Sequence, residues 1–510
     1  VCIWAATPAG HLYGALTLRQ LRAQFGMGLP YLRIGDAPAL RHRGAMLVFP
    51  QGHTAYRPAY MRHVVRELAR WKINVLHLYL ESYFDFPSLP GLAGPGAMTA
   101  ADARALDKLC QNYHIQLVPM LNLLGHCGEI LATQRYHHLL DYGPDDDPRA
   151  IPGFSLCTCE PEVHALVDTI LADIFSCFSA EIIHVGGDEV NLGDCPRCAA
   201  RAAELGKPGL YLEYFHRIQE VCMSHGRKMG LWGDILLHYY QDADPAARRA
   251  VVDSLAQGTV IYDWHYTGGS AGTVQFFVGE GLPTVVSSSS NLVYTASLWL
   301  AQAANQRMLF ADAIVAGALG GMTTAWCNFT GLHEEQYNYL FASGATALWS
   351  GPEGENLVPG LTQELFERAY NLQRYGLRTD ALTRFWHILG DATGPVLTPL
   401  APLHGANVRK CLYHTDNVLT FWKHYAHLLS GEGLAHYREG IRRAREAWEE
   451  VEAASADNPD PYLPLQVGPL LMHEHLLRRY EMSEAVYQRY VEAGRIQFED
   501  PERFVAQLQE

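Results

Sequence analysis

The amino-acid sequence predicts an α/β fold, a (β/α)8 TIM barrel followed by a helical C-terminal domain. Between about residues 44 and 350, short apolar runs alternate with longer amphipathic segments, which is typical of parallel strands joined by crossover helices. Eight such units in roughly 300 residues fit a barrel of this kind. Beyond about residue 360 the pattern is helical throughout, which indicates a separate helical region.

The eight apolar runs are the predicted strands. They cover residues 44–48, 74–80, 115–121, 182–185, 228–232, 260–264, 283–287 and 321–326. The amphipathic segments predicted as helices between them include residues 60–72, 100–113, 161–178, 211–225 and 306–318. In the C-terminal region, charged amphipathic stretches at 431–454 and 470–493 predict two further helices, and a loop rich in Asp, Asn and Pro separates them at 457–464.

These patterns divide the chain into three regions. Residues 1–40 are too short for a domain and are interpreted as the remnant of an N-terminal domain or as a linker. Residues 41–355 form the predicted barrel, and residues 356–510 form the predicted helical domain. The charge runs of the last region are expected to be solvated helix faces, and a homodimer through this region is one expectation.

The composition narrows the classes of partner. The chain has 510 residues, of which 48% are hydrophobic and 18% charged, with a formal net charge of -15 and scattered lysines. A net negative charge without a basic patch argues against nucleic-acid binding and favours a neutral or cationic substrate. No apolar stretch approaches the ~20 residues that a membrane span needs. The chain starts at Val1 rather than at Met, so the sequence leaves the compartment open.

The chain has 11 cysteines, and most stand singly in apolar segments, as buried reduced thiols do, which slightly favours a cytoplasmic location. The exception is a Cys157-Thr-Cys159 pair together with Cys195-Pro-Arg-Cys198. Four such thiols suit a structural zinc ion, but disulfides and plain thiols stay open as alternatives. None of the three would carry the chemistry, for which we expect neither a metal nor a cofactor.

The most informative stretch is Ile-Ile-His184-Val-Gly-Gly-Asp188-Glu189, an apolar run that ends in two glycines and two adjacent carboxylates. Neighbouring carboxylates repel, so their pKa values separate, and one can hold a proton while the other stays ionised. This pair therefore predicts acid/base chemistry. The alternative is that Asp188 caps the next helix and Glu189 lies in its first turn.

Residue types just past the other runs support the first interpretation, because the active site of such a barrel lies where its strands end. In chain order these residues are Glu81 and Asp85, Gly125 and His126, Asp188 and Glu189, Trp232 and Asp234, Trp264 and His265, Tyr294, and Trp326 and Asn328. Aromatic walls with a few polar groups are typical of a pocket for a sugar ring.

With this string on its fourth strand, the sequence resembles glycoside hydrolase family 20, the β-N-acetylhexosaminidases. Residues 14–21, 41–44, 74–82 and 125–126 agree with the family pattern, so the resemblance covers about residues 10 to 350. Residues 79–85 look closer to the branch that includes hexosaminidase D. The resemblance implies hydrolysis of a terminal β-linked N-acetylglucosamine or N-acetylgalactosamine with retention, in which the 2-acetamido oxygen of the glycan substrate is the nucleophile.

The resemblance also implies roles for individual residues. Glu189 protonates the leaving oxygen and activates water, which requires a raised pKa, and Asp188 orients the acetamido group. Tyr294 is similar to the tyrosine that binds the acetamido oxygen, and His126 is a candidate support for the acid. The substrate-binding candidates are Arg43 for the 3- and 4-hydroxyls, Trp232, Trp264 and Trp326 for the pocket walls, and Glu81, Asp234 and Asn328.

Two departures leave the sugar preference open. Asn328 and Ala296 stand where many members have a glutamate and an aspartate, and Glu334, Glu335 or Asp234 are possible replacements. Two other functions are kept as alternatives. One is the same mechanism on a disaccharide, glycolipid or glycopeptide, and the other is a non-catalytic carbohydrate-binding barrel.

Overall fold

The computed structural model describes residues 1–48, 57–80, 83–94, 96–142, 155–255, 257–289, 299–326, 334–351, 363–397, 432–457 and 459–492. These residues form two compact units. The first holds the chain up to residue 289, residues 299–326 and residues 337–366, and the second holds the chain from Glu367 onward with residues 334–336. The three-region division expected from the sequence stays a prediction.

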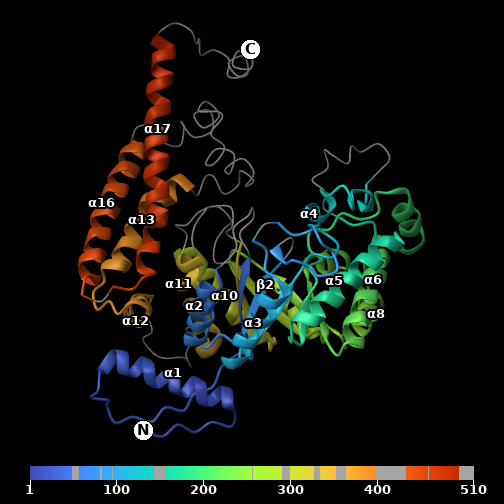
Figure 1. The fold of residues 1–510 in the computed structure, drawn as a ribbon, viewed down its shortest axis with the longest axis horizontal. Helices are drawn as coiled ribbons and strands as arrows, with labels where there is room; N and C mark the ends of the chain where they lie inside the picture. Colours follow the sequence, from blue (N-terminus) through green and yellow to red (C-terminus); the bar gives the residue numbers. More distant parts are fainter. Residues whose placement is uncertain are drawn as a thin grey trace. The chain divides into compact units, whose positions relative to one another are not determined.

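The described part of the first unit contains a closed barrel of eight parallel strands, which confirms the predicted fold class (Figure 1). The strands are β1 (His42–Val48), β2 (Val75–Tyr79), β3 (Gln116–Met120), β4 (Ile182–His184), β5 (Lys228–Trp232), β6 (Thr259–Trp264), β7 (Thr284–Ser289) and β8 (Gly320–Ala325). They pair in chain order, and β1 closes the barrel against β8. All eight runs read from the sequence are therefore strands.

Helices follow the strands in chain order. They include α2 (Pro58–Arg70), α3 (Ala100–Asn112), α4 (Gly128–Leu131), the 3-10 turn η2 (His137–Leu139), α5 (Pro161–Cys177), α6 (Pro196–Ser224), α7 (Asp234–Tyr240), α8 (Pro245–Leu255), α9 (Thr273–Gly279), α10 (Trp299–Ala316), η3 (Glu334–Tyr337) and α11 (Asn338–Ser350). In α2, Met61, Val64, Val65 and Leu68 recur at helical spacing and are buried. A reciprocal capping box between Thr99 and Asp102 fixes the start of α3.

Three helices differ from the prediction. The first is α6, which consists of two helices on either side of a kink at Gly206, a non-helical residue with a φ of +72°; the helix after the kink contains the one predicted at 211–225, and the helix before it, from Pro196, was not predicted. The second is α10, which begins at Trp299 rather than near residue 306. The third is α1 (Pro8–Phe25), which lies in the region interpreted as a remnant and starts where the Thr7 hydroxyl accepts from the Gly10 N–H at 3.1 Å.

The barrel interior combines apolar side chains with buried histidines. Met46, Val118, Met120, Val260, Val285 and Met322 belong to one packed cluster. His42, His77 and His184 lie among them, and the His77 Nε2 is hydrogen-bonded to the Tyr262 hydroxyl at 2.9 Å. Burial lowers the pKa of His42 and of His184 to about 3, so these rings are neutral at physiological pH.

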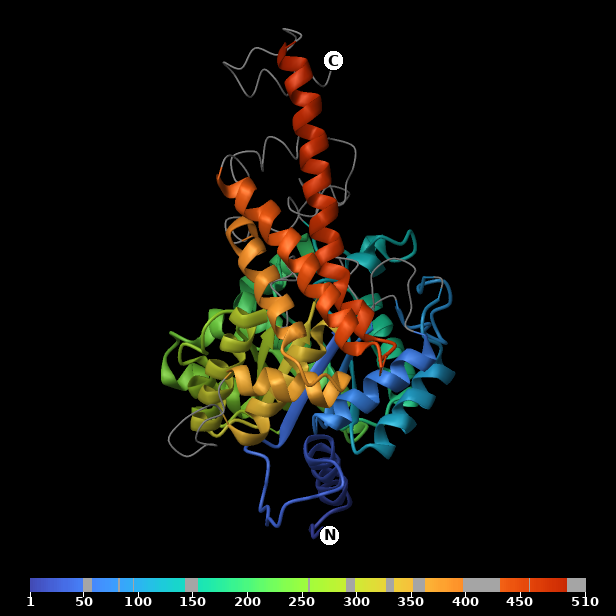
Figure 2. The same cartoon turned by 90° about the vertical axis from the view of Figure 1, so that its left-hand side faces the viewer.

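The second unit is helical in its described residues. Its helices are α12 (Gln363–Tyr375, of which the part from Glu367 belongs here), α13 (Ala381–Leu397), α16 (Glu432–Ser455), the 3-10 turn η5 (Leu463–Val467) and α17 (Gly468–Glu492). Helices α13, α16 and α17 lie side by side (Figure 2). A Cβ at Gly440 would lie 2.2 Å from that of Ala392, so the glycine permits close approach of α16 to α13.

Charged side chains of α16 face solvent, as expected from the sequence. Arg442 pairs with Glu439 at 2.6 Å, and both side chains are more than half exposed. Exposed pairs of this kind contribute little to stability, so the buried contacts between α16 and α13 hold this unit together.

Candidate active site

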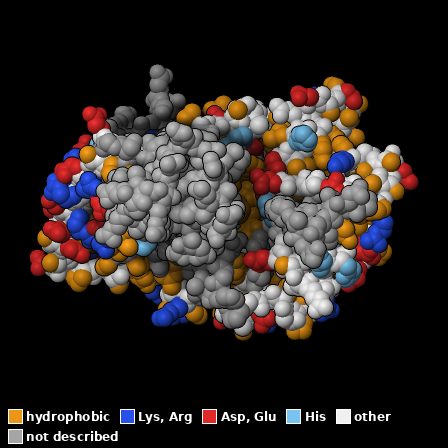
Figure 3. All heavy atoms as spheres, turned by 90° about the horizontal axis from the view of Figure 1, so that it is seen from above, with side chains coloured by type: hydrophobic (Ala, Val, Ile, Leu, Met, Phe, Trp, Pro, Cys, Tyr) orange, Lys and Arg blue, Asp and Glu red, His pale blue; other side chains and the backbone are white. Residues whose placement is uncertain are grey.

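Strand β4 delivers the two carboxylates to the end of the barrel at which the strands finish. The segment after β4 is held from both sides, since the Val185 N–H donates to the Gly230 carbonyl at 2.9 Å and the Trp232 N–H donates to the Gly186 carbonyl at 3.0 Å. His184 adds a third restraint, because its Nδ1 accepts from the Gly186 N–H at 3.2 Å. Seen from above, this face carries Asp and Glu side chains close to hydrophobic ones (Figure 3).

The two glycines are required by space and by backbone conformation. Gly186 has a φ of +77° and Gly187 a φ of +92°, a region that residues with a Cβ rarely adopt. A Cβ at Gly186 would lie 2.4 Å from the Asn122 Oδ1, and one at Gly187 would lie 2.5 Å from the Leu231 Cδ1. The turn that aims Asp188 and Glu189 therefore depends on both glycines.

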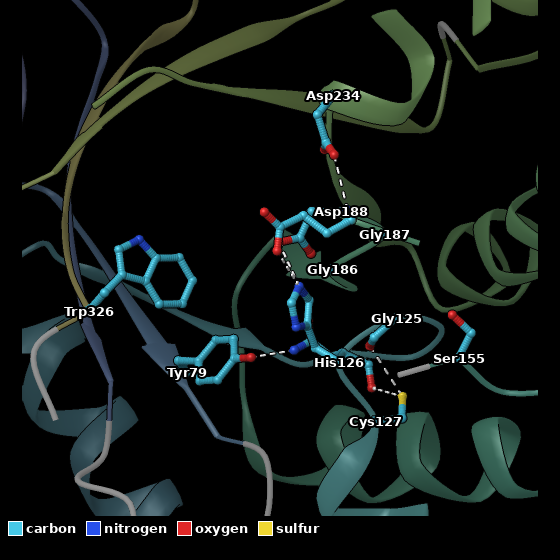
Figure 4. A network of polar contacts seen from close by, with 12 residues as sticks. Tyr79, Gly125, His126, Cys127, Ser155, Gly186, Gly187, Asp188, Asp234 and Trp326 are labelled. Carbon is cyan, nitrogen blue, oxygen red and sulfur yellow. Dashed lines mark hydrogen bonds and ion pairs between the residues drawn. The ribbon is translucent and has the colours of Figure 1, made fainter. Parts of the chain in front are cut away.

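His126 bridges the two carboxylates (Figure 4). Its Nε2 lies 3.5 Å from the Asp188 Oδ2 and 3.2 Å from the Glu189 Oε2. The Asp188 side chain is 15% exposed and the Glu189 side chain 61%, so a ligand from solvent reaches Glu189 first. Glu189 and His126 have φ values of +48° and +54°, which are strained for such residues and concentrate at functional sites.

This arrangement shifts the pKa values of His126 and Glu189. The hydrogen bonds to Asp188 and Glu189 raise the pKa of His126 to about 10, so the ring is a cation at neutral pH. The hydrogen bond from His126 lowers the pKa of Glu189. This direction is opposite to the raised pKa expected for an acid, and the physical reason is that His126, predicted to support this carboxylate, donates to it as a cation.

Asp234 holds the backbone of the same turn. Asp234 lies in the first turn of α7, and its Oδ2 accepts from the Glu189 N–H at 3.0 Å. Burial, together with the charge of Asp188, raises the pKa of Asp234 to about 6. Asp234 was expected to bind substrate, whereas its contact in the structure is with the backbone that carries Glu189.

The three predicted wall tryptophans differ in exposure. Trp264 and Trp326 are half-buried at the ends of β6 and β8, where a ligand can reach them. Trp232 is 1% exposed and belongs to the barrel core, with its ring centroid 6.3 Å from that of Trp326. Trp232 therefore packs against Trp326, and a side chain that is 1% exposed offers almost no surface for the predicted contact with substrate.

Three polar residues around these rings were missed in the sequence. Tyr266 accepts from the Trp326 Nε1 at 2.8 Å, so it fixes the orientation of that indole. The Tyr79 ring lies 5.4 Å from that of Trp326 at a steep angle, and its hydroxyl accepts from the Asn122 amide (Figure 4). Tyr79 ends β2 and Asn122 follows β3, so their place at strand ends was the signal that could have identified them.

The position of Arg43 contradicts the predicted contact with sugar hydroxyls. Arg43 is the second residue of β1 and so lies at the opposite end of the barrel from the carboxylates. The residue is 2% exposed, and its guanidinium donates to the carbonyls of Lys72 at 2.9 Å and Leu40 at 3.0 Å and to the Tyr13 hydroxyl at 3.2 Å. These contacts make Arg43 a structural residue that ties α1 to the base of the barrel.

Several predicted residues lie outside the described residues. They are Glu81, Tyr294 and Asn328, together with Ala296. Glu335, one of the suggested replacements, is buried in the second unit and pairs with Arg374 at 2.6 Å, so its carboxylate is already engaged.

Comparison with known proteins adds the family. Residues 40–351 match the model of the glycosyl hydrolase family 20 catalytic domain. The chain belongs to this family. The match covers the barrel with both carboxylates and His126, and the more specific likeness to the hexosaminidase D branch stays a prediction.

Individual relatives agree with this assignment. The chain is 27% identical over 256 residues to a beta-hexosaminidase of Akkermansia muciniphila (44% of this chain, 51% of the relative) and 25% identical over 302 residues to one of Vibrio furnissii (51% and 46%). It therefore spans about half the length of the curated relatives it matches. The fold is similar to that of the β-N-acetylhexosaminidase from Bacteroides fragilis, with a TM-score of 0.54 and 19% identity over 72% of this chain and 77% of that one.

Among the helices that the structure describes, none is both long enough and apolar enough to cross a membrane.

Proposed function

We propose that this chain is an exo-acting retaining β-N-acetylhexosaminidase that removes a terminal β-linked N-acetylglucosamine or N-acetylgalactosamine from a glycan. The observation that carries the proposal is the pair Asp188 and Glu189 on a turn built for them, with His126 between them. Family membership supports it, because this domain type is found in proteins named as hexosaminidases.

The proposed reaction uses the substrate's own acetamido group. The acetamido oxygen attacks the anomeric carbon, the bond to the leaving oxygen breaks, and Glu189 donates its proton to that oxygen. Asp188 stabilises the positive charge of the oxazolinium intermediate through the acetamido N–H. Glu189 then takes a proton from water, whose oxygen bonds to the anomeric carbon and reopens the ring. The reaction needs no cofactor.

The first step needs a protonated Glu189, and His126 opposes this in the free protein. A sugar over the 61% exposed Glu189 side chain would remove it from water, which raises the pKa of a carboxyl. The bound substrate thus raises the pKa of Glu189, whereas the hydrogen bond from His126 lowers it. We infer that Glu189 becomes an acid when substrate covers it, while Asp188, the more buried of the two, faces the imidazolium of His126.

The test is nitrophenol release from the β-N-acetylglucosaminide and the β-N-acetylgalactosaminide. We expect Glu189→Gln to lose about 10²–10⁴-fold in rate and Asp188→Asn about 10²–10³-fold. The matched control is Glu162→Gln, since Glu162 is also a histidine-paired carboxylate, 2.8 Å from His138, but lies on the exposed side of α5. The ratio of the two native rates decides the sugar preference that Asn328 and Ala296 leave open.

A second comparison tests the nucleophile. The nitrophenyl β-glucoside lacks the acetamido group, so the native chain should not cleave it at a comparable rate. Cleavage of this glucoside as fast as of the acetamido sugar would contradict the substrate-assisted step. A folded chain that is inactive on all three would point instead to a larger glycan or to binding alone. The homodimer expected from the sequence stays a prediction that light scattering can check.

A further inference from the structure

A second cluster of chemically reactive side chains lies beside the site, and the proposed reaction does not use it. Cys157 lies on the segment before α5, and Cys195 and Cys198 lie at the start of α6. The sulfur of Cys157 is 3.3 Å from that of Cys195 and 3.5 Å from that of Cys198, and all three sulfurs lie within 4.8 Å of one another. The three side chains are buried.

These distances do not describe a disulfide. Bonded sulfurs are ~2.05 Å apart, and here one sulfur lies at nearly equal distances from two others. A bond between any two would leave the third thiol buried beside it. Sulfurs held ~2.3 Å from a central zinc ion in a tetrahedron are ~3.8 Å from one another, which is close to the separations in this cluster.

Cys159 is the fourth cysteine of this region, and it lies outside the group of three whose sulfurs are all within 4.8 Å of one another. It packs against the other three as a half-buried member of the same cluster, and its thiol interacts with that of Cys198. Thr158 turns the chain between Cys157 and Cys159, and its hydroxyl lies 3.6 Å from the Cys198 sulfur. A close pair and a CxxC knuckle, distant in sequence, thus meet at one point, as in structural zinc sites.

The surroundings suit a group of thiolates. The Cys198 N–H donates to the Cys195 sulfur at 3.3 Å, and Cys195 is the N-cap of α6, where helix N–H groups favour negative charge. Arg197 lies between these two cysteines and interacts with Cys157 as well as with Glu160. A guanidinium and a helix N-terminus both reduce the cost of gathering several anionic sulfurs.

We propose that Cys157, Cys159, Cys195 and Cys198 bind one Zn²⁺ ion as thiolates. Three buried sulfur ligands and a half-buried fourth form a soft donor set that selects zinc, and binding releases the thiol protons to solvent. The ion has a structural role, since four protein ligands leave no position for water or substrate.

The zinc site joins the two segments that frame the catalytic turn. Asp141 accepts from the N–H groups of Gly193 at 2.9 Å and Cys195 at 2.7 Å, and the Ser155 hydroxyl accepts from the Asn191 N–H at 3.3 Å. Residues 190–195 follow Glu189 directly, so a metal that links residues 157 and 195 limits the movement of that turn.

Metal analysis of the purified full chain tests the proposal independently of activity. We expect about one zinc ion per chain, falling to near zero in Cys157→Ser and Cys198→Ser. The matched control is Cys222→Ser, which removes a buried thiol from the other end of α6 and should keep the metal. Cobalt added in place of zinc should give the sulfur-to-metal charge-transfer absorption of a thiolate site, and each of the two serine variants should lose it.

A variant that fails to fold does not decide the matter, so the native chain is also titrated with a thiol reagent before and after chelation. The site is supported if these four cysteines resist the thiol reagent before chelation and react with it after the chelator has removed the metal. A native chain that holds no zinc after reconstitution with Zn²⁺, that carries iron in its place, or that shows a disulfide within the cluster would overturn the proposal.

Discussion

Replacing Asp234 by Asn should stabilise the protein at neutral pH. The carboxyl of Asp234 has a pKa of about 6 in the folded chain against an ordinary value of 3.8, chiefly because of burial. The folded chain therefore binds more protons between these values, so stability falls as pH rises through this window. At ~1.36 kcal/mol per pKa unit the cost of the charge reaches about 3 kcal/mol above pH 6, and screening of the half-buried side chain reduces this cost to about 1–2 kcal/mol.

Asparagine removes this charge and keeps an oxygen that can accept from the Glu189 N–H. Urea unfolding should therefore show a more stable variant at about pH 7.5, and a gain below ~1 kcal/mol at about pH 4, where the native carboxyl is already neutral when folded. The control is Asp173→Asn, because the buried Asp173 accepts from the N–H and the hydroxyl of Ser88 and should lose stability. A gain that is absent at pH 7.5, or equal at both pH values, would refute the reasoning.

Three further outcomes are expected. Gly187→Ala should cost about 2–4 kcal/mol by urea unfolding and abolish nitrophenol release, because φ is +92° and its Cβ would meet Leu231; unchanged activity would contradict the role of the turn. Arg43→Met should lower stability by about 2–4 kcal/mol without changing KM, because its donors serve buried carbonyls; a raised KM at normal stability would restore the sugar-binding role. The native chain should lose stability between pH 7.5 and 5.5, because the His184 ring has a pKa of about 3 when folded but takes up a proton below ~6.5 when unfolded. His184→Gln should reduce this loss by about 1 kcal/mol; an unchanged dependence of the unfolding free energy on pH would show that another group titrates there.

The barrel could be predicted because each strand is a short apolar run between clear breaks, and buried parallel strands leave that record in any sequence. Helix boundaries were harder. Gly206 and Pro208 do break α6 locally, because Gly206 has a non-helical backbone there, and the part of α6 before this kink is what the pattern at 211–225 did not predict.

For the site, chain direction predicts where a residue lies, whereas its pKa depends on contacts that the sequence does not show. Asp188, Glu189 and His126 follow strands, so chain direction alone brings them to one end of the barrel. Arg43 precedes most of β1, and the same rule, applied to it, would have placed it at the other end. The pKa values could not be predicted, because they depend on the 3.2 Å and 3.5 Å contacts of His126, which no spacing in the sequence encodes.

The structure brings three unfavourable features together at the site, on the turn after β4, the loop after β3 and the first turn of α7. Glu189 and His126 have positive φ values, and strain of this kind costs about 1–3 kcal/mol per residue. Asp234 adds a half-buried charge beside Asp188. Such an arrangement persists only if its surroundings hold it. Asp141 and Ser155 bind the backbone of residues 191–195, which follow Glu189, and the four-cysteine cluster includes Cys195 at the end of that segment. The proposed zinc ion therefore has a physical purpose next to the chemistry: it stabilises a loop whose functional residues destabilise it.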